Sequence, residues 1–358
     1  MTSVVSGDGD VAGAAAAVGE RSDAVLAWTR ELLEPALRAT VATLPPRIRQ
    51  VGAFHHGWVD ERGEPVSGTP GKLVRPALVL GCAVAAGGDP AAAVAVPAAV
   101  AVELVHNASL IHDDIVDGDA TRRGRPAVWS AFGTPKAILA GDALFILAVR
   151  AATRLPAPMV EPAVVRLTDT IQILIDGEQA DLDFESRTTL TTAECLAMAA
   201  GKTGALLECA CALGAQAAGA DGAGVRAYGR FGAHLGLAFQ LADDLLGLWG
   251  DPALTGKPTG SDVRARKKTL PVVAALNSGT PAAAELTVLY ENTGAPLDTA
   301  TSERVLDLVE QAGGRAWAQA RAFRELQRAL HYLHVARPLP GAEKDLTAIA
   351  ELVVCRGH

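Results

Sequence analysis

The chain has 358 residues, of which 49% are hydrophobic and 4% aromatic, and its formal net charge at pH 7 is −8. This length suits one large domain or two ordinary ones, and the acidic balance excludes a general nucleic-acid-binding surface. Alanine is abundant and alternating runs of strand-forming residues are scarce, so the composition predicts an all-α fold. The five cysteines lack CxxC spacing and are odd in number. They indicate free or buried thiols in a reducing, cytoplasmic compartment.

The N-terminal segment, residues 1–21, is rich in Ala, Gly, Ser and Val and has no basic start. We therefore expect no secretory signal and predict a disordered tail, for which a docking partner is left open. Helical periodicity begins near Ser22 and runs to Leu44, where Pro45-Pro46 interrupts it. Residues 22–358 are expected to form a single domain.

The remaining helices are expected between clusters of Gly and Pro. Their ranges are Val74–Ala86, Ala91–Val116, Lys136–Arg154, Pro158–Glu185, Thr192–Ala217, Gly222–Leu248, Leu270–Asn277, Pro281–Tyr290, Ser302–Ala312, Ala316–His334 and Ala342–Val354. The apolar run Ala91–Val102 contains Pro97 and ends at Glu103. It falls short of the ~20 residues that cross a membrane, so we expect no membrane span. A helical bundle around a central cavity fits this pattern.

The most informative motif is an acidic cluster at the end of one long apolar stretch. Asp113, Asp114 and Asp117 lie within five residues. On a helix Asp113 and Asp117 share a face, and Asp114 lies about 100° away. Burying such mutually repelling carboxylates is costly unless cations join them. Hard oxygen donors without a Cys or His cluster indicate Mg²⁺, shared with substrate phosphates.

A second acidic cluster lies more than a hundred residues later in another apolar helical segment. Gln240 and Asp244 are four residues apart and share a helix face, with Asp243 beside them. One Asp-Asp pair alone is more often a helix cap or a solvated face. Two such pairs, each followed by basic residues, favour a metal–diphosphate site.

Basic residues accompany both acidic clusters. Lys72 and Arg75 are three apart at an expected helix start, where free N–H groups favour anions. The other basic positions are Arg122, Arg123, Arg125, Lys202, Lys257, Lys267 and Lys268. Each alone is more often part of a solvated surface. Together they suit two polyphosphates, one bound through metal and one through cations directly.

These motifs resemble those of the trans-isoprenyl diphosphate synthases, the polyprenyl synthetase family, and look most like its actinobacterial members. The resemblance runs from about Ser22 to the C-terminus. It rests on GKLVRP, HNASLIHDDIVDGDATRRGRP, GDALF, GKTG, FQLADDLLGLWGDPALTGKPTGSD and KKTLP, in that order. It implies an all-α, Mg²⁺-dependent enzyme, usually a homodimer, that condenses isopentenyl diphosphate with an allylic diphosphate.

The resemblance also implies a role for each matching residue. The metal ligands are Asp113, Asp114, Asp117, Asp243 and Asp244. The residues that contact the allylic diphosphate are Arg122, Lys202, Lys257 and Lys267. Those that bind isopentenyl diphosphate are Lys72, Arg75, His106 and Arg123. The catalytic set is Asp113, Asp114, Lys202, Thr203, Gln240 and Asp243, of which Thr203 and Gln240 lie near the reacting carbons.

The chain departs from the family pattern at three places. The third acidic position of the second motif is Gly247, which puts the strength of metal binding there in question. The usual GGKxxRP begins with Pro70 in place of a glycine. In the GQxxD region the amide comes from Gln179 or is replaced by Glu178.

The product tail is expected to run along the helix of Asp113, away from the metals. The lining positions are Val105, Ala108 and Ser109, and Phe145 is a candidate for a deeper floor. No bulky aromatic occupies these three helix positions. In this family that pattern implies geranylgeranyl diphosphate as the shortest product, with longer chains open.

Two rival functions stay open. A class I terpene cyclase shares the fold and one acidic motif but needs no isopentenyl site. A non-catalytic subunit of a heteromeric prenyl synthase is a binding role, and Gly247 fits it slightly. The intact acidic clusters and the four isopentenyl-type residues favour the synthase over both.

Overall fold

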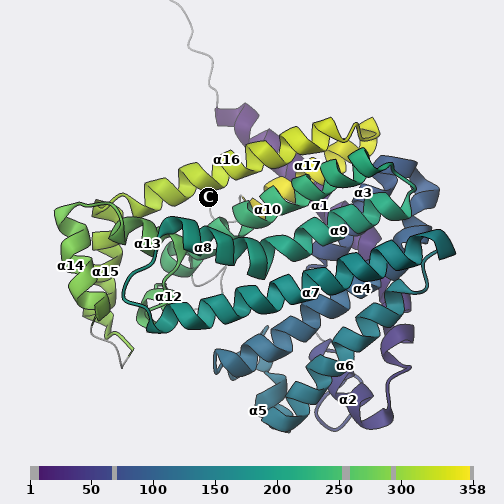
Figure 1. The fold of residues 1–358 in the computed structure, drawn as a ribbon, viewed down its shortest axis with the longest axis horizontal. Helices are drawn as coiled ribbons and strands as arrows, with labels where there is room; N and C mark the ends of the chain where they lie inside the picture. Colours follow the sequence, from purple (N-terminus) through teal and green to yellow (C-terminus); the bar gives the residue numbers. More distant parts are fainter. Residues whose placement is uncertain (1–7, 67–70, 252–258, 292–295, 355–358) are drawn as a thin grey trace, which may run out of the picture. The chain divides into compact units, whose positions relative to one another are not determined.

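The computed structural model describes residues 8–66, 71–251, 259–291 and 296–354. Almost every described element is a helix (Figure 1), and strands are limited to one short hairpin in the described part. The all-α prediction is therefore confirmed. Residue contacts divide the chain into two compact units, each of which is described by itself.

The first unit contains residues up to Ile171, Cys209–Gly229 and Ala336–Ile349. Its own helices are α1 (Asp8–Val41), α2 (Pro46–His55), α3 (Val74–Gly87), α4 (Asp89–Val116), α5 (Val128–Phe132) and α6 (Thr134–Ala152). A hairpin of β1 (Thr121–Arg122) and β2 (Arg125–Pro126) follows α4. This hairpin lies directly after the first acidic motif and carries the neighbouring arginines.

The second unit contains Gln172–Glu208, Arg230–Val335 and the residues from Ala350 onward. Its elements are α8 (Thr192–Ala199), the π-helical turn η1 (Ala200–Gly204), α12 (Ser261–Arg264), α13 (Leu270–Leu276), α14 (Pro281–Glu291), α15 (Thr299–Gln311) and α16 (Gly314–Val335). Four further helices contribute residues to both units: α7 (Ala157–Ser186), α9 (Ala205–Ala217), α10 (Gly222–Trp249) and α17 (Pro340–Val354). A single domain stays a prediction.

The N-terminal segment differs from its prediction. Helix α1 begins at Asp8, so residues 8–21 are helical and not disordered. The run Ala14–Ala17 consists of alanine, which has the highest helix propensity of any residue type. Arg21 is also tethered, because its Nε lies 2.7 Å from a carboxylate oxygen of Asp345. Residues 1–7 lie outside the described part, and the docking role of the tail stays a prediction.

Helix α4 forms the centre of the first unit and packs against both α3 and α6 (Figure 1). Its inward side chains, among them Leu104 and Ile111, are fully buried. Pro97 lies inside the helix and does not end it, so the apolar segment is longer than the run Ala91–Val102. This core holds the C-terminal turn of α4, where the acidic motif lies.

Two helices are long and apolar enough to cross a membrane: Asp89–Val116, and the stretch Thr192–Ala217. A bent pair, Leu270–Leu276 with Pro281–Tyr290, also qualifies if counted as one span. However, 72% of the apolar window of Asp89–Val116 and 56% of that of Thr192–Ala217 are buried inside the protein. Packing accounts for most of this apolar surface. The absence of a membrane span stays a prediction.

The second unit is built around two apolar clusters that share α10 and α13. One cluster includes Leu248, Val272, Leu286 and Val305. The buried members of the other cluster are Phe184, Leu190, Cys195, Ala199, Leu241, Leu270, Val273, Ala318 and Ala322. Leu241 and Leu248 anchor α10 on either side of the second acidic motif, which fixes the positions of Asp243 and Asp244.

Candidate active site

The first acidic motif sits at the C-terminal end of α4. Asp114 is only 1% exposed, whereas Asp113 is half-buried and Asp117, the residue that caps the helix, is exposed. Oδ1 of Asp114 accepts a hydrogen bond of 2.7 Å from Nε of Arg122, and Nη2 of Arg122 lies 2.7 Å from the same oxygen as an ion pair. Its other oxygen, Oδ2, is buried without a hydrogen-bond partner. A buried carboxylate oxygen without a partner is energetically unfavourable unless a cation or a water molecule binds it.

Burial raises the pKa of Asp114, and the nearby Arg122 opposes that rise only in part. A divalent cation beside this carboxylate would remove the penalty of its charged form. In the part of the chain that is described, no three His, Cys, Asp or Glu side chains are grouped as a ready-made metal site. The fit of Mg²⁺ therefore rests on the hard oxygen donors and on the unpaired oxygen of Asp114.

The β1–β2 hairpin positions the two arginines that follow the motif. Its turn residues Arg123 and Gly124 have positive φ angles of 52° and 72°, as a type I′ turn requires. Positive φ is strained for a residue other than glycine and often marks a functional position. Arg122 thereby points to Asp114, and Arg123 lies against Gly71. A Cβ added at Gly71 would lie 2.7 Å from Nη2 of Arg123, so the guanidinium of Arg123 packs directly on Gly71.

The predicted isopentenyl diphosphate residues gather in the same unit. Nη1 of Arg75 lies 3.2 Å from Nε2 of His106. Burial lowers the pKa of His106 well below its usual value, and the charges of Arg75 and Arg123 lower it further. His106 is therefore neutral and accepts a hydrogen bond from Arg75. Lys72 is exposed just before α3. Arg75, His106 and Arg123 thus lie near one another, and the binding of isopentenyl diphosphate by these residues and Lys72 stays a prediction.

A buried network lies beside this group and was not predicted from the sequence. Nε2 of His55 lies 3.0 Å from Oδ1 of Asn107, and Nδ2 of Asn107 donates to Oε1 of Glu103 at 2.8 Å. Burial raises the pKa of Glu103, while Asn107 and the charges of Arg75 and Arg123 oppose the rise. Glu103 and Asn107 stand four residues apart in an apolar run. That spacing is the signal that both side chains serve one buried network.

A pocket opens between the hairpin and the end of α2. Its lining includes His55, Asp114, Arg122 and Arg123. Arg125 also lines it, but its guanidinium donates to the backbone oxygens of Phe54 and Val59 at 3.0 and 2.9 Å. Those bonds hold the hairpin, so the basic pair available to an anionic ligand is Arg122 and Arg123.

Lys202 is held by two carboxylates in the second unit. It lies in η1, a π-helical turn of the kind often found at functional sites. Its Nζ is 2.7 Å from Oε2 of Glu178 and 2.7 Å from Oδ2 of Asp181. The two carboxylates stand three residues apart on one face of α7. Together they raise the pKa of Lys202 against the opposing effect of burial.

A polar chain continues from the residue after Lys202. Oγ1 of Thr203 donates to Oε1 of Gln240 at 2.6 Å, and Nε2 of Gln240 donates to Oδ1 of Asp244 at 2.7 Å. The second oxygen of Asp244 accepts from the backbone N of Leu270 at 2.8 Å. A Cβ added at Gly236 would lie 2.6 Å from Cα of Gly204. This glycine contact allows α10 and η1 to approach closely enough for the hydrogen bonds between Thr203, Gln240 and Asp244 to form.

The second acidic motif differs in exposure between its two members. Asp243 is exposed, whereas Asp244 is buried. Burial, helped by the neighbouring charges of Asp243 and Asp262 and opposed by the hydrogen bonds from Gln240 and Leu270, raises the pKa of Asp244 to about 7. The carboxylate of Asp262 fills the space into which a side chain at Gly247 would project. The missing third acidic residue of the motif is thus explained by a carboxylate that already occupies its place.

The remaining basic residues near the second acidic motif are either candidates for ligand contact or bound to the backbone of the protein. Lys267 is exposed after α12, where contact with a ligand stays a prediction. Lys268 instead donates to the backbone oxygens of Phe184, Glu185 and Arg187 near the end of α7. Lys257 lies outside the described residues.

The departure in the GQxxD region is resolved by the structure. Gln179 donates to Asp183 at the surface, 2.9 Å away, whereas Glu178 faces Lys202. Glu178 therefore takes the place of the usual amide.

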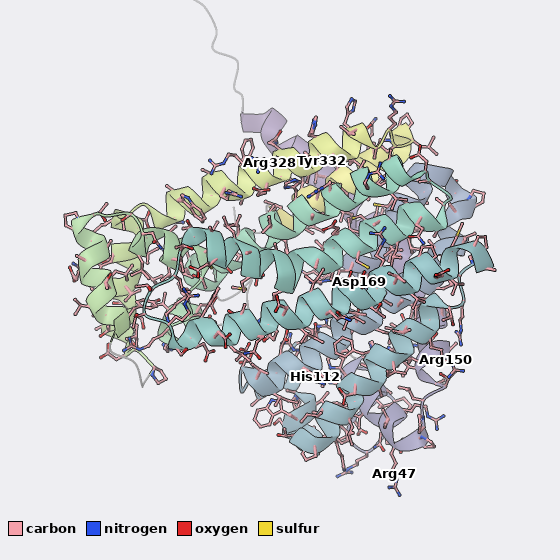
Figure 2. All side chains as sticks on the ribbon, viewed as in Figure 1. Arg47, His112, Arg150, Asp169, Arg328 and Tyr332 are labelled. Atoms are coloured by element: carbon pink, nitrogen blue, oxygen red, sulfur yellow. The ribbon has the colours of Figure 1, made fainter. Side chains whose placement is uncertain are left out.

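The predicted tail-lining residues are only partly accessible. Val105 and Ala108 are 0% exposed and Ser109 is 8% exposed, so all three side chains are buried and Ser109 alone keeps a small accessible area. The ring of Phe145 lies 5.8 Å from that of His112, which neighbours Asp113 and also contacts α6 (Figure 2). Phe145 is therefore beside the acidic motif, and the structure does not place it deeper along α4 as a floor.

Comparison with known proteins gives a consistent result. The sequence model of the polyprenyl synthetase family matches residues 56–309. A (2E,6E)-farnesyl diphosphate synthase of Mycobacterium tuberculosis is 46% identical over 310 residues, or 86% of this chain and 85% of the relative. A geranylgeranyl diphosphate synthase of the same organism is 45% identical over 334 residues, or 93% of each chain.

Solved structures agree. The polyprenyl synthetase from Streptomyces coelicolor A3(2) has a TM-score of 0.88 and 44% identity, covering 93% of this chain and 99% of its own. The all-α fold and its acidic and basic motifs thus define a prenyltransferase of the isoprenoid synthase class. The chain belongs to the polyprenyl synthetase family, and the resemblance is confirmed. The comparisons favour neither the cyclase nor the non-catalytic subunit.

Proposed function

We propose that the protein is a Mg²⁺-dependent synthase that condenses isopentenyl diphosphate with an allylic diphosphate to give a trans-prenyl diphosphate. The observation that supports this most is the pair of neighbouring sites in the first unit. One site combines a buried carboxylate with Arg122. The other groups Arg75, His106 and Arg123. A cyclase has one diphosphate to bind and has no use for the second, purely cationic site.

Each group of residues has one task in the proposed reaction. Mg²⁺, when bound, supplies neutralising charge for the leaving diphosphate. Arg122 and Lys202 donate to that diphosphate and stabilise its growing charge as the allylic C–O bond breaks. Lys72, Arg75, His106 and Arg123 hold the diphosphate of isopentenyl diphosphate. The double bond is thereby presented to the allylic carbon.

Completion of the reaction requires loss of one proton. The π electrons of isopentenyl diphosphate form the new C–C bond, and the resulting cation loses a proton from the adjacent carbon. An oxygen of the released diphosphate is the proposed acceptor of this proton. In this proposal Thr203 and Gln240, which are joined by a hydrogen bond, act near the reacting carbons, and water that would quench the cation must be excluded.

Product length is a separate proposal. Ala108 and Ser109 are small, which supports geranylgeranyl diphosphate or a longer product. The two mycobacterial relatives are named for products of different length, one a farnesyl and one a geranylgeranyl diphosphate synthase. The product of this protein therefore has to be identified by direct assay. Because Val105, Ala108 and Ser109 are all buried, a long tail along α4 requires the packing around them to open.

Assembly and location follow from the same proposal. Helix α6 exposes Ile138, Leu139 and Ile146, which are 45%, 58% and 72% accessible. Their spacing of seven and eight residues puts them in one stripe. We propose that this stripe is the homodimer interface of a cytoplasmic enzyme.

The experiment combines purified protein, Mg²⁺ and isopentenyl diphosphate with dimethylallyl, geranyl, farnesyl or geranylgeranyl diphosphate in separate reactions. Mass spectrometry identifies the products. Elongated diphosphates are expected. Hydrocarbons from one starter alone would indicate the cyclase, and no product from any starter would indicate the non-catalytic subunit.

A further inference from the structure

We propose that Glu178 is a positioning residue that acts through Lys202 and makes diphosphate binding at Lys202 dependent on a divalent cation. The proposal rests on the proposed function, in which Lys202 contacts the allylic diphosphate. Its geometric basis is the double ion pair of Lys202 with Glu178 and Asp181, both 2.7 Å long. The side chain of Glu178 is the least exposed of the three, at 17%.

The backbone fixes this arrangement. A Cβ added at Gly201 would lie 3.4 Å from Cα of Gly177, and one added at Gly177 would collide with the backbone N of Lys202. The η1 turn and α7 are therefore in direct backbone contact. Glu178 and Asp181 stand one and four residues after Gly177. The ammonium of Lys202 donates a hydrogen bond to Oδ2 of Asp181, and Oε2 of Glu178 lies 2.7 Å from the same Nζ as an ion pair.

The balance of charge at Lys202 is negative before any ligand binds. One ammonium faces two carboxylates, so the local net charge is −1. With the amide that the GQxxD pattern places at position 178, this local charge would be zero. An incoming diphosphate is itself an anion. Charge repulsion over a few ångströms in a partly buried site is strong enough to weaken its binding. Divalent cations that arrive with the diphosphate reverse this balance.

This extra carboxylate has two separable effects. It holds the Lys202 ammonium from a second side, next to the ion pair with Asp181. It also disfavours an anion that arrives without metal. A purely structural Glu178 would change stability alone, whereas a positioning residue changes the dependence of binding on Mg²⁺.

The test is isothermal titration of the full-length protein with inorganic diphosphate, once in EDTA and once in saturating Mg²⁺. Glu178→Gln is expected to bind about ten-fold more tightly than the wild type in EDTA. In Mg²⁺ the two proteins are expected to differ much less. Asp183→Asn is the matched control, since it removes one exposed carboxylate from the same helix. It is expected to behave as the wild type.

Diphosphate also has the cationic group of Arg75 and Arg123 available, so the effect must be assigned to Lys202. In a Lys202→Ala background, Glu178→Gln is expected to give no gain in EDTA. A gain that persists there, or equal affinities of wild type and Glu178→Gln in EDTA, overturns the proposal. Glu178→Asp, which keeps the charge, is expected to keep the dependence on Mg²⁺ and serves if Glu178→Gln folds poorly.

A kinetic readout separates this proposal from the function on which it rests. The Mg²⁺ concentration that gives half-maximal turnover is expected to fall in Glu178→Gln. A wild-type protein that neither elongates any starter nor binds diphosphate with Mg²⁺ contradicts the proposed function itself. An active wild type whose Mg²⁺ dependence matches that of Glu178→Gln contradicts only the role of Glu178.

Discussion

At the scale of single residues, Asp114 carries the clearest mark of function. The carboxylate of Asp114 is 1% exposed, with one oxygen paired to Arg122 and the other without a partner. Such a buried group does not favour the stability of the fold. Stability alone would favour an apolar residue there. The arrangement makes sense if the second oxygen meets a cation during the reaction.

Asp114→Asn is expected to lower kcat on the order of 10²-fold or more while the helical circular dichroism stays unchanged. The amide keeps the shape but loses the charge that attracts Mg²⁺. Asp23→Asn, an exposed position on α1, is the control and should retain full turnover. Near-normal turnover of Asp114→Asn would remove this residue from the metal site.

Gly247 gives a second prediction at this scale. Gly247→Asp restores the family pattern but places a side chain where the carboxylate of Asp262 already lies. We expect a loss of about 2 kcal/mol in the free energy of unfolding, measured by urea titration, through steric and charge repulsion. Combining it with Asp262→Ala should recover most of that loss. Full stability of the single variant would show that the two positions are not in conflict.

The sequence predicts part of this residue-level picture. Helical spacing predicts that Gln240 and Asp244 share a face of α10, and their hydrogen bond agrees with that. The contacts of Lys202 with Glu178 and of Thr203 with Gln240 join different elements, so the motifs indicate these residues without predicting their partners. Other assignments need the fold. Lys268 donates to backbone oxygens of α7 that lie more than eighty residues away in the sequence. Spacing in the sequence does not reveal such a contact.

At the scale of elements, glycine contacts decide how closely helices approach. Gly177→Ala is expected to destabilise the protein by about 2 kcal/mol, because its Cβ would meet the backbone N of Lys202. It should also raise the KM for the allylic diphosphate. Gly19→Ala, on helix α1 with nothing within 4 Å of the added Cβ, should be neutral or slightly stabilising. Thermal unfolding of both variants makes the comparison, and equal melting temperatures would contradict it.

Long helices are predictable from periodicity, but short elements are not. Helices α5 and α12 are five and four residues long, too short to show a 3.6-residue pattern. The sequence does not predict helix α2, because Pro45-Pro46 indicates a break, whereas Pro46 occupies the first position of a new helix. The β1–β2 hairpin escapes prediction because its turn uses Arg123 at positive φ, where the expected sequence signal is Asn or Gly.

At the scale of the whole molecule, acid sensitivity should trace in part to Glu325. This buried carboxylate on α16 accepts from Nδ1 of His234 and Nε of Arg321, both at 2.7 Å, and Arg328 lies on the same helix at 3.2 Å. Figure 2 shows Arg328 and Tyr332 one turn apart on α16, and Tyr332 stacks on His234 with ring centres 5.4 Å apart. Burial favours a higher pKa for Glu325, but His234 and Arg321 outweigh it, so the pKa is lowered from 4.5.

A lowered pKa means that the folded state binds this proton less readily than the unfolded state. The stabilisation is therefore present above pH 4.5, the unfolded value, and is lost as the pH falls through the lowered folded pKa. Glu325→Gln should cost about 3 kcal/mol at pH 7. The difference from wild type should shrink in acid, as urea unfolding at several pH values would show. A difference that stays constant with pH would contradict the role of this charge.

Assembly is the second prediction at this scale. Ile146→Glu on the exposed stripe of α6 should shift the protein from dimer to monomer in light scattering coupled to size exclusion, because a charge would be buried in an apolar interface. Val288→Glu, at an exposed apolar position of α14, should leave the dimer intact. A monomeric wild type, or a dimeric Ile146→Glu, would place the interface elsewhere.

The most direct test of the central proposal is turnover with isopentenyl diphosphate and each allylic starter, with products identified by mass spectrometry in the presence and absence of Mg²⁺. The proposed chemistry predicts prenyl diphosphates lengthened by five-carbon units, formed only with Mg²⁺ and lost in Arg123→Ala. Products that contain no carbon from isopentenyl diphosphate, or no product with any starter, would contradict it.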